Sequence, residues 1–279
     1  MTNWLHAPLS PEITRYVECY WFIEKQPGVE GHAFPKLNPD PSAHLVLSPP
    51  TQRYRYEMEQ RVFEGEGSHW LFPHLHTFEL DHRDPFVHIG IKFHAGALYS
   101  LTLLEYVHPT LDVIMPVTLS SVMEHVSDAE DMLITLARKS PTQTCEQLDA
   151  LLLPWLKKSR EDQHSEVTRK ALQLLDTMSV SALGDTLYCS QRTLERSFSR
   201  VTGLTLKQCQ SMNKLEAMLA YLYQREATEI DWSDVALKFG FSDQPHLIRH
   251  LKKQIGLTPN TYAKKRSLTI DVYGGVKYS

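Results

Sequence analysis

The chain has 279 residues, of which 42% are hydrophobic and 22% are charged, and its formal net charge at pH 7 is −4. This composition is typical of a soluble globular protein that is long enough for two domains. The sequence has no apolar run of about 18 residues, which excludes a membrane-spanning helix, and its first residues lack the pattern of a secretory signal. The four cysteines form no C-x-x-C pair, which favours a reduced cytoplasmic protein over a disulfide framework or a cysteine zinc site.

Charge is divided unevenly along the chain. Residues 161–279 hold 16 Lys and Arg against 13 Asp and Glu, a net charge of +3, whereas residues 1–160 hold 13 against 20, a net charge of −7. A basic C-terminal part beside an acidic N-terminal part favours a polyanionic partner for the basic part. Many solvated surfaces would show so small a difference, so the charge alone does not decide the partner.

Roughly the first 110 residues read as short strands broken by turns, which predicts a small sheet, sandwich or barrel. Residues 86–94, FVHIGIKFH, place Val87, Ile89, Ile91 and Phe93 on one face, which predicts a half-buried strand. SAHLVLS, residues 42–48, alternates in the same way. The segments PKLNPDPS and EGEGS are typical of turns or loops.

From about residue 119 the apolar spacing becomes helical, and helices are expected over residues 127–139 and 142–158, where Pro154 would kink or end the second. The polar segment 159–165 is expected to be a linker. The predicted fold is therefore α+β with two domains. Residues 1–160 are β-rich to about residue 115 and then helical, and residues 161–279 form an all-α domain.

A nineteen-residue pattern occurs twice, at 188–206 and 241–259, and the two copies align without a gap. A short helical segment precedes each copy, Gly240 allows a sharp turn before the second, and Ser190 and Asp243 are good helix N-caps at matching positions. Helix, tight turn and helix is the geometry of the helix-turn-helix motif, whose second helix enters the major groove of DNA. Residues 206–226 predict one long helix between the copies, which would hold two recognition helices about one DNA turn, ~34 Å, apart.

The exposed faces of both second helices carry side chains that can read bases, because Arg bonds guanine, Gln pairs with adenine, Glu accepts from cytosine and an apolar side chain touches the thymine methyl. The alternative is that these are ordinary solvated faces, and two copies in register argue against it.

These residues resemble the AraC/XylS family of bacterial transcription regulators, most closely in GFSDQPHLIRHLKKQIGLTPNTY, and the resemblance covers about residues 165–266. It implies seven helices, with two helix-turn-helix units joined by a long helix. The base-facing positions that it implies are Gln191, Arg192, Glu195, Arg196, Gln244, Pro245, Ile248 and Arg249, and the implied phosphate contacts are Arg200, Lys252 and Lys253.

Four positions depart from the family pattern: Leu206 stands where a proline is usual, Lys214 where an arginine is usual, Met218 where an alanine is usual and Trp232 where an isoleucine is usual. The segments NPDPSAHLVLS and IGIKFHAGALYSL resemble the domain that often precedes this module, which implies a cupin-like β-barrel sensor.

The N-terminal part contains a histidine-rich patch, HWLFPHLHTFELDH. On a strand His74 and His76 would share a face and could begin a metal site, but the spacing to Glu79 and Gly90 departs from the pattern of cupin enzymes. Pocket or surface histidines are therefore favoured, and no metal or cofactor is expected. Six residues are candidates for an effector pocket, with packing in the core as the alternative: Trp21, Trp70, Phe72, His74, His76 and Phe93.

The sequence thus predicts a cytoplasmic transcription regulator that is not an enzyme and binds double-stranded promoter DNA. A small-molecule effector, a second copy of the chain and RNA polymerase are candidate further partners. One alternative is a metal-dependent cupin-like enzyme or metal sensor fused to a DNA-binding module. Another is a regulator whose N-terminal domain serves only for dimerisation, and the apolar run at residues 151–156 is a candidate dimer surface.

Overall fold

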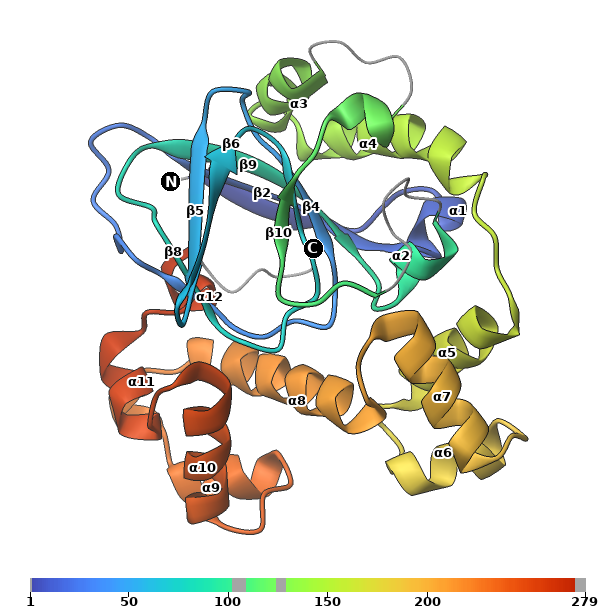
Figure 1. Ribbon diagram of the computed structural model, residues 1–279. Helices are drawn as coiled ribbons and strands as arrows, with labels where there is room; N and C mark the ends of the chain where they lie inside the picture. Colours follow the sequence, from blue (N-terminus) through green and yellow to red (C-terminus); the bar gives the residue numbers. More distant parts are fainter. Residues whose placement is uncertain (1, 102–108, 124–128, 274–279) are drawn as a thin grey trace.

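The computed structural model describes residues 2–101, 109–123 and 129–273 (Figure 1). Two antiparallel sheets form the N-terminal part, and helices form the C-terminal part, so the predicted α+β class is confirmed. No helix of the described chain is long and apolar enough to cross a membrane.

The larger sheet has the strand order β1-β2-β9-β4-β7-β10 and the smaller sheet the order β3-β8-β5-β6. The strands are β1 (Thr2–His6), β2 (Val17–Lys25), β3 (Lys36–Leu37), β4 (His44–Leu47), β5 (Arg53–Met58), β6 (Arg61–Glu66), β7 (His69–Leu71), β8 (Phe78–Leu80), β9 (Phe86–Phe93) and β10 (Ile114–Pro116). The predicted strands at 42–48 and 86–94 are confirmed as β4 and β9. The two predicted loops were partly wrong, because Lys36 and Leu37 pair with β8 and residues 61–66 pair with β5.

The prediction that β9 is half-buried was wrong, because all eight of its residues are buried. Its apolar face, with Ile89 and Ile91, packs in one core with α3 (Ala129–Ala137) and α4 (Pro141–Leu156). Its other face carries His88, which lies near His69, and His69 in turn contacts Tyr56 of the smaller sheet. A strand covered on both faces can still alternate in sequence when one of the buried faces is polar.

The apolar run at 151–156 is used within the N-terminal part. Leu152, Trp155 and Leu156 are buried in the core, and Leu151 and Leu153 pack against it. The helix α4 continues for two residues beyond Pro154. Shorter elements connect this part: α1 (Pro11–Thr14), α2 (Ala97–Ser100) and the 3-10 turn η1 (Leu119–Ser121).

Seven α-helices, α5 to α11, span residues 163–265, as the family resemblance implied. They are α5 (Gln163–Leu174), α6 (Val180–Thr186), α7 (Gln191–Thr202), α8 (Leu206–Tyr223), α9 (Trp232–Lys238), α10 (Gln244–Ile255) and α11 (Pro259–Lys265), with a 3-10 turn η2 (Ala227–Glu229) after α8 and a short α12 (Thr269–Tyr273) at the end. Because α5 already begins at Gln163, the connection from α4 is shorter than the predicted linker at 159–165.

The repeated pattern encodes one unit of structure twice. Gly203 and Gly256 end α7 and α10 in the left-handed conformation, with φ of 74° and 70°. The leucine that follows each glycine is buried, and the next residue, Thr205 or Thr258, caps the helix after it. Glycine is used there because it adopts positive φ at little cost. The motif Gly-Leu-Thr therefore stops one helix, anchors the chain in the core and starts the next helix.

The N-terminal part packs against the C-terminal ends of both α7 and α10 (Figure 1). At the first end, a Cβ atom on Gly96 would lie 2.7 Å from Val201 Cγ1, and one on Gly203 would lie 2.9 Å from Pro109 Cβ. At the second end, Thr77 Oγ1 donates to the carbonyl oxygen of Gln254 at 2.7 Å. The start of each recognition helix therefore points away from the N-terminal part.

Gly96→Ala tests the close approach of the two parts. Gly96 and Gly28 have φ of 76° and 77°, but a Cβ atom on Gly28 would meet nothing within 4 Å. Both substitutions should cost about 1–2 kcal/mol of backbone strain, and Gly96→Ala should cost more because it also pushes α7 away. Denaturant unfolding measures the stability of both variants.

Tryptic cleavage after Lys157, Lys158 or Arg160, which are exposed between α4 and α5, reports on docking directly. Cleavage should be faster in Gly96→Ala than in Gly28→Ala. Equal stability and equal cleavage of the two variants would show that the contact does not hold the parts together.

Candidate nucleic-acid interface

Side-chain caps position the start of each recognition helix. Ser190 accepts a hydrogen bond from the backbone N–H of Thr193, and Asp243 accepts one from that of His246. The preceding turns reach positive φ at Tyr188, at 52°, and at Gly240, at 65°. Asp231 caps α9 by accepting hydrogen bonds from the backbone N–H groups of Ser233 and Asp234. The predicted pair of helix-turn-helix units is therefore confirmed as local structure.

Each recognition helix buries one face and exposes the other. Leu194, Phe198 and Val201 of α7 are buried in or beside one small core, and Leu247, Leu251 and Ile255 of α10 are buried in another. Apolar residues at spacings of three and four form such a stripe on a helix. The remaining faces are the candidate base-reading surfaces.

Most of the predicted base-facing side chains lie on these open faces. Arg192, Glu195, Arg196, Gln244, Pro245 and Arg249 are exposed, whereas Gln191 and Ile248 are half-buried. No hydrogen bond or ion pair to the described residues holds the guanidinium groups of Arg192, Arg196 and Arg249. A free guanidinium can form the two-pronged contact with guanine.

Gln191 differs from its neighbours. Its Nε2 donates to Glu195 Oε1 at 2.9 Å, and its own amide oxygen is buried and has no hydrogen-bond partner among the described residues. This hydrogen bond links two predicted base-facing residues across one turn of α7. A base that Gln191 binds must therefore displace Glu195 from Nε2 or share that donor with it.

The three predicted phosphate contacts fall into two groups. Lys252 and Lys253 are exposed in the last turn of α10. Arg200 instead donates through Nε to the hydroxyl of Tyr99 in the N-terminal part at 3.2 Å, and that hydroxyl donates to Asp162 at 2.8 Å. Docking of the N-terminal part thus occupies one predicted phosphate contact.

The sequence did not single out a group of lysines between the two units. Lys207 and Lys214 on α8, together with Lys238 on α9, line a cavity of about 590 Å³ beside α8. The two α8 lysines are seven residues apart and therefore lie on one face of the helix. This spacing is the feature of the sequence that could have predicted the group.

The four departures from the family pattern are accommodated. Thr205 caps α8 in the absence of a proline at Leu206, while Met218 and Trp232 are buried in the core of the second unit. Lys214 lies over the ring of Phe241 at 3.9 Å and donates to the carbonyl oxygen of Gly240 at 3.3 Å. The lysine therefore braces the turn of the second unit.

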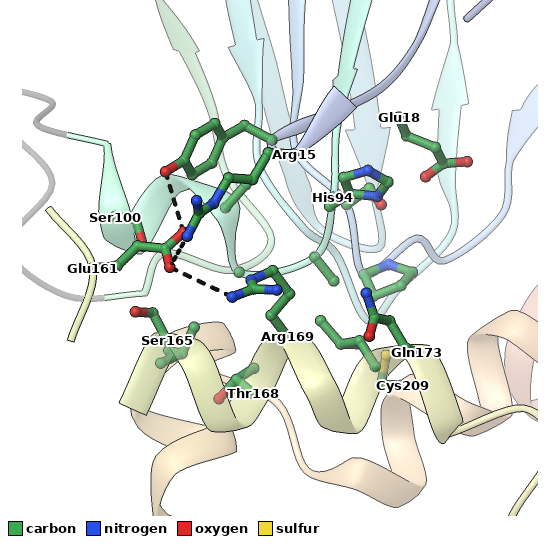
Figure 2. A pocket seen from close by; sticks show the side chains of 18 of the residues that line it. Arg15, Glu18, His94, Ser100, Glu161, Ser165, Thr168, Arg169, Gln173 and Cys209 are labelled. Carbon is green, nitrogen blue, oxygen red and sulfur yellow. Dashed lines mark hydrogen bonds and ion pairs between the residues drawn. The ribbon is translucent and has the colours of Figure 1, made fainter. Parts of the chain in front are cut away.

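The six predicted effector-binding residues have different surroundings. Trp70, Phe72 and Phe93 belong to the core of the N-terminal part, and Trp155 packs against Trp70 and Phe93. Trp21 lies on the opposite face of β2 from Phe22 in that core, and it donates to His44 at 3.1 Å. A cavity lies between the N-terminal part and the helices α5, α7 and α8, and none of the six residues lines it (Figure 2).

His74 and His76 do not form the strand pair that would begin a metal site. The strand β7 ends at Leu71, so the following residues do not alternate between two faces. His74 is buried, with its ring nitrogens beside the carbonyl oxygens of Asn38 and Phe72, whereas His76 is exposed beside Asp112. Among the residues that the structure describes, no three His, Cys, Asp or Glu side chains gather as metal ligands would.

Three other histidines lie together between the sheets, with ring centroids of His69 and His88 6.2 Å apart and those of His82 and His88 6.4 Å apart. Burial lowers the pKa of His69 to about 4 and that of His82 to about 3, and it also lowers the pKa of His88. His69 is satisfied as a neutral ring, because it bonds both the carbonyl oxygen of Gly67 and the hydroxyl of Tyr56. These side chains are therefore neutral parts of the core at pH 7.

These depressed pKa values make stability fall as the pH falls. In the unfolded chain each histidine binds a proton near pH 6.5, whereas in the folded chain His69 does so only near pH 4. Acidification from pH 7 to pH 5 should therefore cost roughly 2 kcal/mol through His69 alone. Denaturant unfolding across this range should give a flatter profile for His69→Gln than for the wild type, and His32→Gln, at an exposed position, should leave the slope unchanged. An unchanged slope in His69→Gln would contradict the assignment.

Comparison with known protein families identifies the type of domain that the C-terminal part forms. Residues 183–265 match the model of a family described as a helix-turn-helix domain. This part of the chain is an AraC-type domain. Residues 6–108 match the model of a domain of unknown function, DUF6597. No curated protein matches the chain.

Several solved structures are similar to this chain. ToxT from Vibrio cholerae is 9% identical, with 89% of this chain and 99% of that chain covered and a TM-score of 0.42. The DNA-binding domain of AdpA, in complex with a target DNA, is 28% identical over 37% of this chain and 92% of that one, with a TM-score of 0.30. The C-terminal domain of the response regulator AraT from Geobacillus stearothermophilus is 21% identical over 39% of this chain and 92% of that one, with a TM-score of 0.33.

Proposed function

We propose that this protein is a cytoplasmic transcription regulator whose AraC-type domain reads two half-sites in promoter DNA. The observation that carries the proposal is the pair of capped recognition helices, of which α7 presents the free guanidinium groups of Arg192 and Arg196 on its open face and α10 presents that of Arg249. The helix α8 has 18 residues and spans roughly 27 Å. With a recognition helix beyond each end (Figure 1), this length suits successive major-groove segments about 34 Å apart.

Lysines supply the part of the affinity that does not depend on sequence. Lys252 and Lys253 are exposed on the second recognition helix, and Lys207, Lys214 and Lys238 lie around the cavity between the units. Phosphates between the two half-sites would face such a group. Contacts of this kind position a protein on DNA without specifying bases.

Residues 1–160 form the N-terminal part. In this proposal it is a cupin-like regulatory domain that has no catalytic role. Its contacts with Arg200 and with the end of α10 support this role, because they connect it to both DNA-reading units. A homodimer and contact with RNA polymerase are further parts of the proposal. Sedimentation with and without operator DNA measures the first, and transcription with purified polymerase measures the second.

The first experiment is selection of duplexes from a random library by the purified full chain at physiological salt. The proposal expects a consensus with two short informative blocks, centred about one helical turn apart. A single block would mean that only one unit reads bases, and no enrichment would contradict sequence-specific binding by the free protein.

Arg249→Ala should weaken binding to the consensus by roughly 1–3 kcal/mol and relax one base position, because it removes a base contact. Binding to random DNA should change much less. The control is Lys139→Ala, which removes a positive charge from an exposed site in the N-terminal part. Equal losses on consensus and random DNA would contradict the base-reading role of Arg249.

Lys253→Ala should weaken binding to every sequence alike, because the lysine neutralises a phosphate. The slope of log affinity against log salt should fall in magnitude by about 0.9. Titration of the DNA at several salt concentrations measures the slope, and an unchanged slope together with a changed consensus would move Lys253 to the base-reading group.

A further inference from the structure

The turn before the recognition helix is built from different residues in the two units. In each unit the residue after the C-cap of the first helix is left-handed. It is Tyr188, with φ of 52°, after α6 and Gly240, with φ of 65°, after α9. The next residue of each turn donates its backbone N–H to a carbonyl oxygen five residues back, at 3.0 Å in the first unit and 2.8 Å in the second. Both turns therefore have the form of a Schellman motif, in which glycine is the usual left-handed residue.

The fold makes no use of the side chain of Tyr188. A left-handed backbone is unfavourable for a residue that has a Cβ atom, and a bulky residue there is an outlier. Tyr188 is nevertheless 98% exposed, and no hydrogen bond or ring contact joins its side chain to the described residues. A strained residue whose side chain does nothing for the fold is a candidate for contact with a partner.

The segment that carries this tyrosine has no basic side chain. Residues 171–191, which include α6 and the turn, contain two aspartates but no lysine or arginine. The hydroxyl of Thr186 bonds a backbone carbonyl within α6, and those of Ser179 and Ser181 bond each other at 3.1 Å. The second unit instead has Lys238 at the end of α9. The tyrosine hydroxyl is therefore a free hydrogen-bond donor in a segment without cations.

The turn lies where the backbone of bound DNA would pass, and this step rests on the proposed function. A recognition helix contacts base edges with its N-terminal residues, and Arg192 and Arg196 occupy that part of α7. Tyr188 comes two residues before Ser190, the cap of α7, which places it at the edge of the groove beside the phosphates of the bordering strand. In Figure 1, α6 lies on the side of α7 that faces away from the N-terminal part, so this edge is open.

We infer that the hydroxyl of Tyr188 donates a hydrogen bond to a backbone phosphate beside the half-site that α7 reads. Such a contact positions a protein on DNA and carries no base information. A hydroxyl group brings no positive charge and releases no counterion, so it strengthens binding to the same degree at low and high salt. The first unit thereby differs from the second, whose exposed Lys252 and Lys253 are cations.

Two substitutions separate the contact from the fold. Tyr188→Phe keeps the ring and removes the hydroxyl. It should weaken binding to the selected consensus by roughly tenfold, with the base preferences and the salt slope unchanged. Tyr188→Gly should weaken binding at least as much, yet it should raise the melting temperature by roughly 2–4 °C, because glycine relieves the left-handed strain. A misfolded variant cannot lose DNA affinity while it gains stability.

Glu59→Gly is the matched control. Glu59 is exposed in the turn between β5 and β6, with φ of 51°, and these strands lie far from α6 (Figure 1). Glycine there relieves the same kind of strain, so the variant should gain stability as Tyr188→Gly does and should bind DNA as the wild type does. A salt slope that fell in Tyr188→Phe, or a loss of DNA affinity as large in Glu59→Gly as in Tyr188→Gly, would contradict a direct contact by the hydroxyl.

A scan of the DNA backbone locates the contact. Each phosphate of the consensus is replaced in turn by a neutral methylphosphonate, and the affinity of the full chain is measured for every duplex. Tyr188→Phe should lose the sensitivity of the wild type at one phosphate and keep it at the others. That phosphate should flank the block whose base preference changes in Arg196→Ala. Identical scans for Tyr188→Phe and the wild type would overturn the contact.

The same titrations distinguish this inference from the function on which it rests. A wild type that selects no consensus would remove the proposed function and the contact together. Selection by the wild type, with unchanged affinity in both Tyr188 variants, would remove the contact alone and leave the two-unit reader in place.

Discussion

The close approach of two glycines to side chains of the opposite part is the constraint on which the arrangement of this molecule depends. A Cβ atom on Gly96 would lie 2.7 Å from Val201 Cγ1, and one on Gly203 would lie 2.9 Å from Pro109 Cβ, which is closer than real Cβ atoms approach. Both glycines also have positive φ, so backbone conformation and lack of volume are required at the same points. Because this contact seats the end of α7 against the N-terminal part, it also forms one wall of the cavity and brings Arg200 to Tyr99.

The two ends of each recognition helix have different surroundings. The starts of α7 and α10 carry most of the predicted base-facing side chains, which are mostly exposed. The ends of the two helices are held by the N-terminal part through packing at Val201 and through the Thr77 hydrogen bond to Gln254. A charge cluster around the buried Lys92 adds a third connection, since Lys92 lies 3.5 Å from the exposed Glu216 of α8 as well as near Glu18 and Asp40. These carboxylates outweigh the effect of burial and raise the pKa of Lys92. A ligand or partner that changed this seating would act on both units together.

The histidines of the N-terminal part show how a residue pattern can suggest the wrong chemistry. His74 and His76 look like a metal-binding pair on a strand, but the strand ends before them and they occupy different environments. His69, His82 and His88, which are distant in sequence, instead meet between the sheets as neutral, buried rings. The aromatic side chains Trp70, Phe72 and Phe93 likewise fill the core. Neither the histidine pairing nor an aromatic pocket could be tested until the register of the strands was known.

The sequence by itself determined the local structure of the DNA-binding part, because helix caps, left-handed glycines and apolar stripes act within a few residues of one another. Ser190, Asp243, Gly240 and the long helix α8 all lie where the repeated pattern placed them. Only the tertiary structure decided which faces of β9 are covered, which histidines meet, and that Arg15, Glu161 and Arg169 surround one cavity. Those relations depend on how the strands pair in the sheets and how separate cores pack against one another, which no local pattern records.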